Sequence, residues 1–122
     1  MRILIVDDDE IFCRFLVEVF EGMGMQTAWT TSGLAGYAMI TEQNFDLCII
    51  DFRMPLILGT YLVEAIREDC PHVKIILASA FADESLHEYA NRMGIWLLSK
   101  PFTQSLLLAT VERALGASMS RN

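Results

Sequence analysis

The sequence predicts a doubly wound α/β fold, in which helices cover both faces of a parallel sheet. Two observations predict it: short apolar runs alternate five times with longer segments of helical periodicity, and the first run, RILIV, is apolar almost throughout. Such alternation is typical of βαβ units, and a strand covered on both faces carries few polar residues. With 122 residues and 53% apolar composition, residues 1–122 are expected to form a single domain with a sizeable core.

Five strands are predicted, because five runs are short and rich in apolar residues. They are RILIV, MQTAW, DLCII, VKIILA and IWLLS, at residues 2–6, 25–29, 46–50, 73–78 and 95–99. Each run is followed by a segment of helical period. If the strands are parallel, these segments are the crossovers that join them.

Five helices are therefore predicted, at residues 10–21, 33–42, 59–69, 84–93 and 104–116. Ser32, Asp83 and Thr103 each precede a helix and are suited to cap its N-terminus. Gly94 and Pro71 lie where two helices are expected to stop. In the first helix, the apolar residues at helical spacing are interpreted as core, and they are Phe12, Phe15, Leu16, Val19 and Phe20.

Composition argues against several classes of protein. The longest apolar runs are far shorter than the roughly 20 residues of a membrane-spanning helix, and acids interrupt the first run before a signal peptide could form. The formal charge of −7 disfavours direct nucleic-acid binding. Cys13, Cys48 and Cys70 lack metal-ligand spacing and are interpreted as thiols of a reducing compartment. We expect a cytoplasmic protein that contacts neither membrane nor nucleic acid.

Polar residues follow four of the predicted strands. Asp7 and Asp8 follow the first, Asp51 the third, Ser79 the fourth and Lys100 the fifth. The carboxyl ends of parallel strands share one edge of the sheet, and sites form where the strand order reverses. Clustered carboxylates raise one another's pKa unless a cation holds them, and ligands that are all oxygen favour Mg²⁺. We therefore predict Mg²⁺ held by Asp8 and Asp51, with Asp7 reaching it directly or through water.

This constellation is suited to phosphoryl transfer. A carboxylate such as Asp51, beside a metal ion and Lys100, is a possible nucleophile toward phosphorus. Ser79 would then hydrogen-bond an oxygen of the attached phosphoryl group. Asp9 and Glu10 continue the acidic run, but we assign them to the positive N-terminal end of the first helix.

The pattern resembles the receiver domain of two-component response regulators, including the chemotaxis regulator. The likeness covers essentially all 122 residues and rests on VDD, DFRMPLILG, AS and KPF, each at the end of a predicted strand. The resemblance implies a flavodoxin-like, five-stranded parallel sheet of order 2-1-3-4-5. It also implies a cis peptide bond between Lys100 and Pro101.

The resemblance also implies a role for each site residue. Asp51 would be the phosphoacceptor, Ser79 the switch hydroxyl and Lys100 the lysine of the family. The implied Mg²⁺ ligands are Asp7, Asp8, Asp51 and the main-chain carbonyl of Arg53. The phosphodonor would be a phosphohistidine of a sensor histidine kinase or phosphotransfer protein, or a small phosphodonor.

The implied output is a changed surface formed by residues 84–93, 95–99 and 104–116. This surface would contact an effector domain or a second copy of the chain in a homodimer. The domain would catalyse its own phosphorylation and dephosphorylation without turning over an external substrate, so whether it is an enzyme stays open.

The sequence departs from the family pattern at two places. Leu97 stands where the family usually has Tyr or Phe, and Trp96, one residue earlier, could replace that ring only if the strand shifts by one. In the loop PLILG, Leu56, Ile57 and Leu58 are unusually apolar beside an anionic site. These departures keep an alternative open, in which a degenerate receiver acts as a phosphorylation-independent interaction module. An aspartyl phosphohydrolase is disfavoured, because VDDDEIF lacks the DxDGT motif.

In the family geometry that the resemblance implies, two bulky residues flank the phosphoacceptor. Arg53 lies two residues beyond Asp51, and Phe81 lies two residues beyond Ser79. Neither is a carboxylate or amide that could orient an attacking water molecule. We therefore predict slow self-dephosphorylation.

Overall fold

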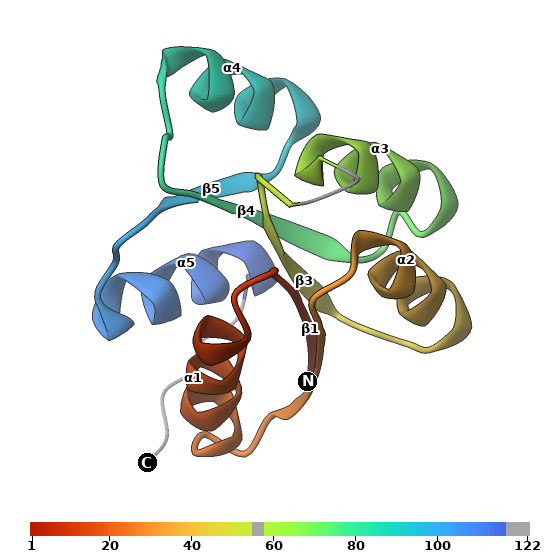
Figure 1. The fold of residues 1–122 in the computed structure, drawn as a ribbon, viewed down its shortest axis with the longest axis vertical. Coiled ribbons are helices and arrows are strands. Elements are labelled where there is room, and N and C mark those ends of the chain that lie inside the picture. Colours follow the sequence, from red (N-terminus) through yellow and green to blue (C-terminus); the bar gives the residue numbers. More distant parts are fainter. Residues whose placement is uncertain (55–57, 117–122) are drawn as a thin grey trace.

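The structure is a computed structural model that describes residues 1–54 and 58–116. In the described residues the chain alternates between strand and helix (Figure 1). The strands are β1 (Arg2–Val6), β2 (Gln26–Thr30), β3 (Leu47–Asp51), β4 (Lys74–Ser79) and β5 (Trp96–Ser99). The helices are α1 (Glu10–Glu21), α2 (Gly33–Glu42), α3 (Gly59–Asp69), α4 (Glu84–Met93) and α5 (Gln104–Leu115).

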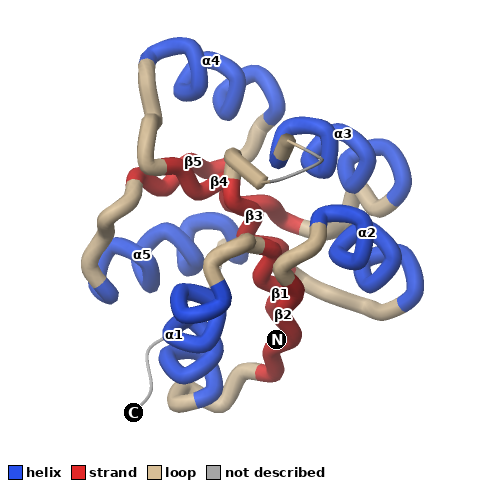
Figure 2. Tube along the Cα trace, in the orientation of Figure 1, coloured by secondary structure: helices blue, strands red, loops and turns tan. Residues whose placement is uncertain are grey.

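The five strands form one parallel sheet of order β2-β1-β3-β4-β5. Helices α1 and α5 cover one face of this sheet, and α2, α3 and α4 cover the other (Figure 2). The predicted doubly wound fold and its strand order 2-1-3-4-5 are therefore confirmed. Because the order reverses between β1 and β3, the ends of these two strands form the edge where a site is expected.

Two hydrophobic clusters make the core, one on each face of the sheet. Alternate residues of β1 separate into them: Leu4 and Val6 pack toward α2–α4, whereas Ile3 and Ile5 pack toward α1 and α5. Every residue of β3 is buried, as expected for a central strand covered on both faces. The three cysteines are buried and free. Within the described residues, no helix combines the length and apolarity that crossing a membrane requires.

The predicted boundaries differ from the observed ones by one residue in most strands. Pairing in parallel register continues to Asp51, which lies opposite Ala78, and to Ser79, which lies opposite Ser99. Asp51 and Ser79 are therefore the last residues of β3 and β4 rather than the first residues of the loops. Helix α5 ends one residue before the prediction, because Gly116 adopts the left-handed conformation (φ 67°) that terminates it.

The three predicted N-caps are confirmed. Ser32, Asp83 and Thr103 each accept a hydrogen bond from the main-chain N–H three residues later, at 3.2, 2.9 and 3.0 Å. Each side chain satisfies a donor that has no partner within its helix. The caps fix where α2, α4 and α5 begin.

The prediction that all the apolar residues of α1 are core is wrong at Phe15. Leu16 and Phe20 are fully buried, but 48% of Phe15 is exposed. Five apolar residues are wider than the stripe that one helix can bury. The same limit explains α5, where Leu107 is buried and Leu106 is 44% exposed.

Helix α3 begins in close contact with the end of β3, and only glycine fits there. A Cβ atom on Gly59 would lie 2.4 Å from the carbonyl oxygen of Asp51 and 3.0 Å from the Cα of Phe52. The Gly59 N–H also donates to the Phe52 carbonyl at 2.9 Å. Gly59 therefore brings α3 directly against the strand end that carries Asp51.

Replacing Gly59 by Ala is expected to lower the free energy of unfolding by about 1–3 kcal/mol, because the methyl group overlaps main-chain atoms that cannot rotate away. Urea unfolding measures this change. Tyr61→Ala is the control, since 68% of Tyr61 is exposed on the same helix and its loss should cost less than about 0.5 kcal/mol. Equal stability of the two variants would contradict the close contact.

Candidate functional site

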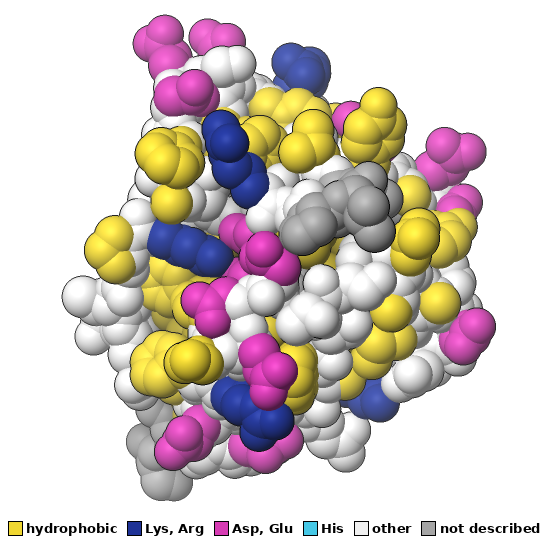
Figure 3. All heavy atoms as spheres, in the orientation of Figure 1, with side chains coloured by type: hydrophobic (Ala, Val, Ile, Leu, Met, Phe, Trp, Pro, Cys, Tyr) yellow, Lys and Arg dark blue, Asp and Glu magenta, His cyan; other side chains and the backbone are white. Residues whose placement is uncertain are grey.

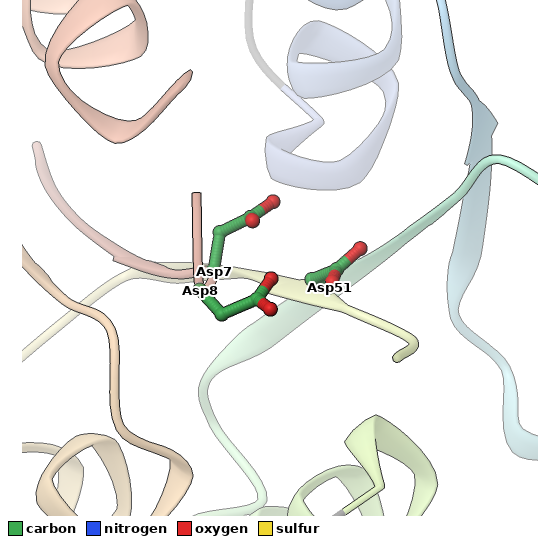
Figure 4. Close-up of side chains that lie close together, drawn as sticks. All are labelled: Asp7, Asp8 and Asp51. Atoms are coloured by element: carbon green, nitrogen blue, oxygen red, sulfur yellow. The ribbon is translucent and has the colours of Figure 1, made fainter. Parts of the chain in front are cut away.

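Three carboxylates lie together at the carboxyl ends of β1 and β3. Asp7 and Asp8 follow β1 and Asp51 ends β3, so two separate parts of the chain supply them (Figure 4). Oxygen atoms from the three carboxylates all lie within 4.8 Å of one another. In the space-filling view, acidic side chains gather at the centre of this face, with basic and hydrophobic side chains beside them (Figure 3).

Main-chain contacts fix the position of Asp7. Its N–H donates to the Thr30 carbonyl at 3.2 Å, which extends the pairing of β1 with β2 by one residue. Its carboxylate accepts from the Asp9 N–H at 2.9 Å, and its carbonyl accepts from the Cys13 thiol at 3.3 Å. Asp9 in turn caps α1 by accepting from the Phe12 N–H. The placement of Asp9 at the N-terminus of α1 agrees with the sequence prediction.

Lys100 connects two of the carboxylates. Its ammonium group donates to Asp7 at 2.7 Å and to Asp51 at 3.1 Å. The Lys100 N–H donates to the Ser79 carbonyl at 2.8 Å, so the residue is held to the end of β4. The ammonium also lies 4.3 Å from the ring centroid of Phe12, a cation–π contact. The predicted cis bond between Lys100 and Pro101 is confirmed.

Ser79 is buried, and its hydroxyl accepts a hydrogen bond from the Phe81 N–H at 3.0 Å. The structure brings all of the predicted site residues to one pocket of about 220 Å³. Its lining is Asp7, Asp8, Asp9, Asp51, Arg53, Ser79, Ala80, Phe81 and Lys100. A phosphoryl-sized group in this pocket would therefore face carboxylates, a hydroxyl and an ammonium group.

Arg53 and Phe81 meet at this pocket. The guanidinium carbon of Arg53 lies 5.3 Å from the ring centroid of Phe81, at a cation–π distance. The ring is 67% exposed, so the stacked pair lies at the surface of the pocket. The resemblance implied that each residue flanks Asp51, but it could not show that they contact each other.

The electrostatics of the site oppose the ionised form of Asp51. Burial is the largest cause and the neighbouring Asp7 the next, and together they raise the pKa of Asp51 to about 6 despite the opposing effect of Lys100. For Lys100, burial alone would lower the pKa. Its contacts with Asp7 and Asp51 outweigh this effect and raise it, so the ammonium stays protonated.

The donor atoms present fit a magnesium ion. The three clustered ligands are carboxylate oxygens, and Asp8 is exposed, which leaves room for ligating water. Mg²⁺ prefers such a set, with few carboxylates and several waters. Arg53 lines the same pocket, and the role of its carbonyl as a ligand stays a prediction.

Leu97 and Trp96 lie on opposite faces of the sheet. Leu97 packs with the cluster under α2–α4, whereas Trp96 packs with the cluster under α1 and α5. The substitution of Trp96 for the missing aromatic residue is therefore not supported. Aromatic rings do pack in the same cluster as Leu97, and Tyr89 is the one that α4 supplies. Of the loop residues singled out above, Leu58 is exposed, and Leu56 and Ile57 lie outside the described residues.

Sequence reasoning missed the contact of Phe12 with Lys100. Its ring lies against Lys100 and makes an edge-to-face contact with Phe102, at 5.7 Å between centroids. The residue had been assigned to the core from its helical spacing alone. Its position in the first turn after the acidic run was the available signal.

Fold and site together define a class. A flavodoxin-like sheet of order 2-1-3-4-5, with clustered carboxylates and a lysine at its carboxyl edge, is the architecture of the receiver proteins of two-component signalling. A family model supports the same conclusion. The model described as the response regulator receiver domain matches residues 3–112, and the chain belongs to this family.

Named relatives agree with this assignment. The response regulator receiver protein CpdR of Brucella abortus is 31% identical over 118 residues, which cover 96% of this chain and 98% of CpdR. The uncharacterized transcriptional regulatory protein YclJ of Bacillus subtilis is 32% identical over 113 residues, 92% of this chain and 49% of YclJ. The chain thus spans about half the length of YclJ, and 27% of the transcriptional regulatory protein ZraR of Escherichia coli.

Solved structures show the same fold. A CheY-like receiver domain protein of Methanospirillum hungatei superposes with a TM-score of 0.88 at 27% identity, covering 94% of this chain and 93% of its own. The response regulator TrrA of Thermotoga maritima, solved in complex with Mg²⁺ and BeF, has a TM-score of 0.84 at 27% identity, with coverage of 93% and 98%.

Asp51→Asn is expected to raise the free energy of unfolding of the metal-free protein at pH 7.5 by about 1–3 kcal/mol. The pKa of Asp51 is raised from 3.8 to about 6 in the folded state. The folded carboxyl therefore keeps a proton that the unfolded one releases, and wild-type stability falls as pH rises across this window. Urea unfolding in EDTA between pH 4 and pH 7.5 measures the difference.

The advantage of the Asp51→Asn variant should grow through this window and level off above it. Glu88→Gln, at an exposed position of α4, is the control and should differ from wild type by less than about 0.5 kcal/mol. A variant less stable than wild type at pH 7.5 would contradict the electrostatic strain at Asp51.

Proposed function

We propose that this chain is a phosphoacceptor receiver unit, formed by residues 1–122, in which Asp51 accepts a phosphoryl group. One observation carries the proposal: the Lys100 ammonium contacts Asp51 and Asp7 at the point where three carboxylates converge. A purely structural ion pair needs one carboxylate. Three of them, with a buried hydroxyl in the same pocket, suit a site that handles a cation and an anionic group together.

In the proposed reaction, a carboxylate oxygen of Asp51 attacks the phosphorus atom of a phosphohistidine or a small phosphodonor. A P–O bond forms as the bond from phosphorus to the donor breaks, and the donor atom takes the electron pair and then a proton. Lys100 and Ser79 lie where they can neutralise and orient phosphoryl oxygens. The attack needs the ionised form of Asp51, whose pKa in the metal-free protein is raised to about 6 by burial and Asp7.

Asp8 and Asp51 are proposed to hold Mg²⁺, with Asp7 as a direct or water-mediated ligand and the Arg53 carbonyl as a further one. The bound ion would neutralise charge on the phosphoryl oxygens. It would also offset the repulsion that raises the pKa of Asp51.

An apolar pocket beside the site supports a protein as the phosphodonor. The pocket measures about 460 Å³ and shares Lys100 and Ala80 with the acidic pocket. The remaining lining residues are Phe12, Phe15, Pro101 and Phe102. Phe12 and Phe15 belong to α1, and on this helix Ile11 is 81% exposed. We propose that a sensor histidine kinase or phosphotransfer protein covers this surface as it presents its phosphohistidine.

The proposed output is a change in α4, β5 and α5 that an effector domain or a second copy of the chain would sense. YclJ and ZraR are named transcriptional regulatory proteins, and the chain matches only part of each. An effector domain of this chain is therefore a proposal, as are its cytoplasmic location and its place in a phosphorelay. The acids, the hydroxyl and the lysine meet in one pocket, and this favours the phosphoacceptor over the degenerate alternative.

The wild-type chain, incubated with Mg²⁺ and acetyl phosphate, is expected to gain the mass of one phosphoryl group, because Asp51 provides an ionised oxygen beside Lys100. Intact-mass spectrometry measures the gain. Asp51→Asn should show none, whereas the control Asp46→Asn, at the opposite end of β3, should behave as wild type. A wild-type protein without any gain in mass, or equal gains in wild type and Asp51→Asn, would contradict the proposal.

Loss of the phosphoryl group is expected to be slow, because Arg53 and Phe81 stack at the pocket and neither orients a water molecule. Replacing both by Ala should accelerate the loss severalfold, as followed by the decay of the phosphorylated mass after the donor is removed. Tyr61→Ala, which removes an exposed ring of α3 away from both pockets, is the control. An unchanged decay rate in the double variant would end the idea.

A further inference from the structure

Helix α4 is anchored to α3 at its C-terminal end by Arg67. The Arg67 guanidinium donates to the carbonyls of Met93 and Gly94, at 2.8 and 2.7 Å. These carbonyls end α4, where the helix itself offers them no donor. Hydrogen bonds from an ionised donor are roughly twice as strong as neutral ones. The contact therefore holds this end of α4 firmly.

The middle of α4 is held to α3 by a weaker contact through Tyr89. Its hydroxyl lies 3.3 Å from the Thr60 carbonyl and 3.2 Å from the Glu64 carboxylate. Both distances exceed the usual 2.7–2.8 Å of an O–H···O bond, and one proton must serve two acceptors. Burial and Glu64 raise the pKa of Tyr89 to about 12, so the hydroxyl keeps this proton. We call this contact the Tyr89 latch.

The beginning of α4 is connected to the acidic pocket. The Ser79 hydroxyl accepts from the Phe81 N–H at 3.0 Å, and the Phe81 carbonyl accepts from the Asp83 N–H at 3.0 Å. Asp83 caps α4 through the Leu86 N–H at 2.9 Å. A phosphoryl oxygen in the pocket would turn the Ser79 hydroxyl toward itself and loosen its bond to Phe81. The disturbance would reach α4 through its cap.

There is room for α4 to respond. A groove of about 440 Å³ lies between α3 and α4, and its lining includes Phe81, Glu64 and Tyr89. The polar groups of the latch thus line a groove, while Leu86 and Ala90 of the same helix are buried in the core. A shift of the middle of α4 would break only the long hydrogen bonds of Tyr89, whereas the end held by Arg67 would have to break two short ones.

We propose that α4 works as a lever when Asp51 is phosphorylated: Arg67 holds its C-terminal end in both states, and the Tyr89 latch holds its middle only in the unphosphorylated state. This inference rests on the proposed phosphoacceptor function. Because a contact made in one state only shifts the balance between the two states, removing the latch favours the phosphorylated state.

Tyr89→Phe keeps the ring and removes the hydroxyl, and it is expected to tighten the binding of beryllofluoride, a phosphoryl mimic, by about three- to tenfold. Isothermal titration in the presence of Mg²⁺ measures the dissociation constant. Glu64→Gln removes the charged acceptor and should tighten binding in the same direction by less. Tyr61→Phe, which removes an exposed hydroxyl from α3, is the matched control and should bind as wild type.

Arg67→Met separates the two ends of the lever. Because its contacts are made in both states, this variant should be less stable with and without ligand, yet bind beryllofluoride within about twofold of wild type. Amide hydrogen exchange gives a second readout: beryllofluoride should change the exchange of the first half of α4 more than that of its last turn.

The lever is overturned if Tyr89→Phe binds beryllofluoride no more tightly than Tyr61→Phe, or if Arg67→Met changes the affinity as much as Tyr89→Phe does. Equal changes of amide exchange along α4 would also overturn it. These results presuppose a wild-type protein that binds the mimic. A wild-type protein that does not bind it would instead overturn the proposed phosphoacceptor function, so the two failures are distinguishable.

Discussion

The contact of one ammonium group with two carboxylates is the constraint on which the site depends. Lys100 lies 2.7 Å from Asp7 and 3.1 Å from Asp51, and it thereby joins the ends of β1, β3 and β5. The sheet brings these ends to one edge, but their acids repel one another there. Main-chain pairing of Lys100 with Ser79 places the compensating charge. The contact lets acids that are 44 residues apart in the sequence share one pocket.

This compensation is incomplete, and its incompleteness suits the proposed chemistry. Lys100 lowers the pKa of Asp51, yet burial and Asp7 raise it further, so the carboxylate is left in an unfavourable environment. A folded domain tolerates such strain only if other parts stabilise it. Here the apolar strands do so, since β3 is buried along its whole length. A bound cation would relieve the repulsion, so the same strain favours metal binding. The cation and Lys100 would then neutralise the dianionic phosphoryl group of an acyl phosphate on Asp51.

The sequence predicted the elements well because their signals are local. Apolar runs, helical period and cap residues each lie within a few neighbours, so Ser32, Asp83 and Thr103 were identified as caps before their contacts were known. The parallel topology then predicted that Asp7, Asp8 and Asp51 lie together at the carboxyl edge of the sheet. Contacts across helices gave no such signal: the stacking of Arg53 on Phe81 and the reach of Tyr89 to α3 join residues more than 20 positions apart. The prediction that Phe15 is core was wrong, because the apolar pattern of a helix does not reveal how wide a stripe of it the rest of the fold covers.

In the proposed function, the two faces of the sheet have different roles: the α1 face receives the phosphodonor and the α4 face carries the response. Around α1, the apolar pocket shares Lys100 with the acidic pocket, so a partner that covers it can reach Asp51. Around α4, the path begins at Ser79 and runs through main-chain groups, for which the side chain at position 97 is immaterial. Leu97 lies in the cluster beneath α4, where an aliphatic side chain can pack without coupling to the hydroxyl. In the proposed lever, α4 responds to the site without the family's aromatic residue, because the Asp83 cap connects the beginning of the helix to Ser79 and Tyr89 contacts α3 at its middle.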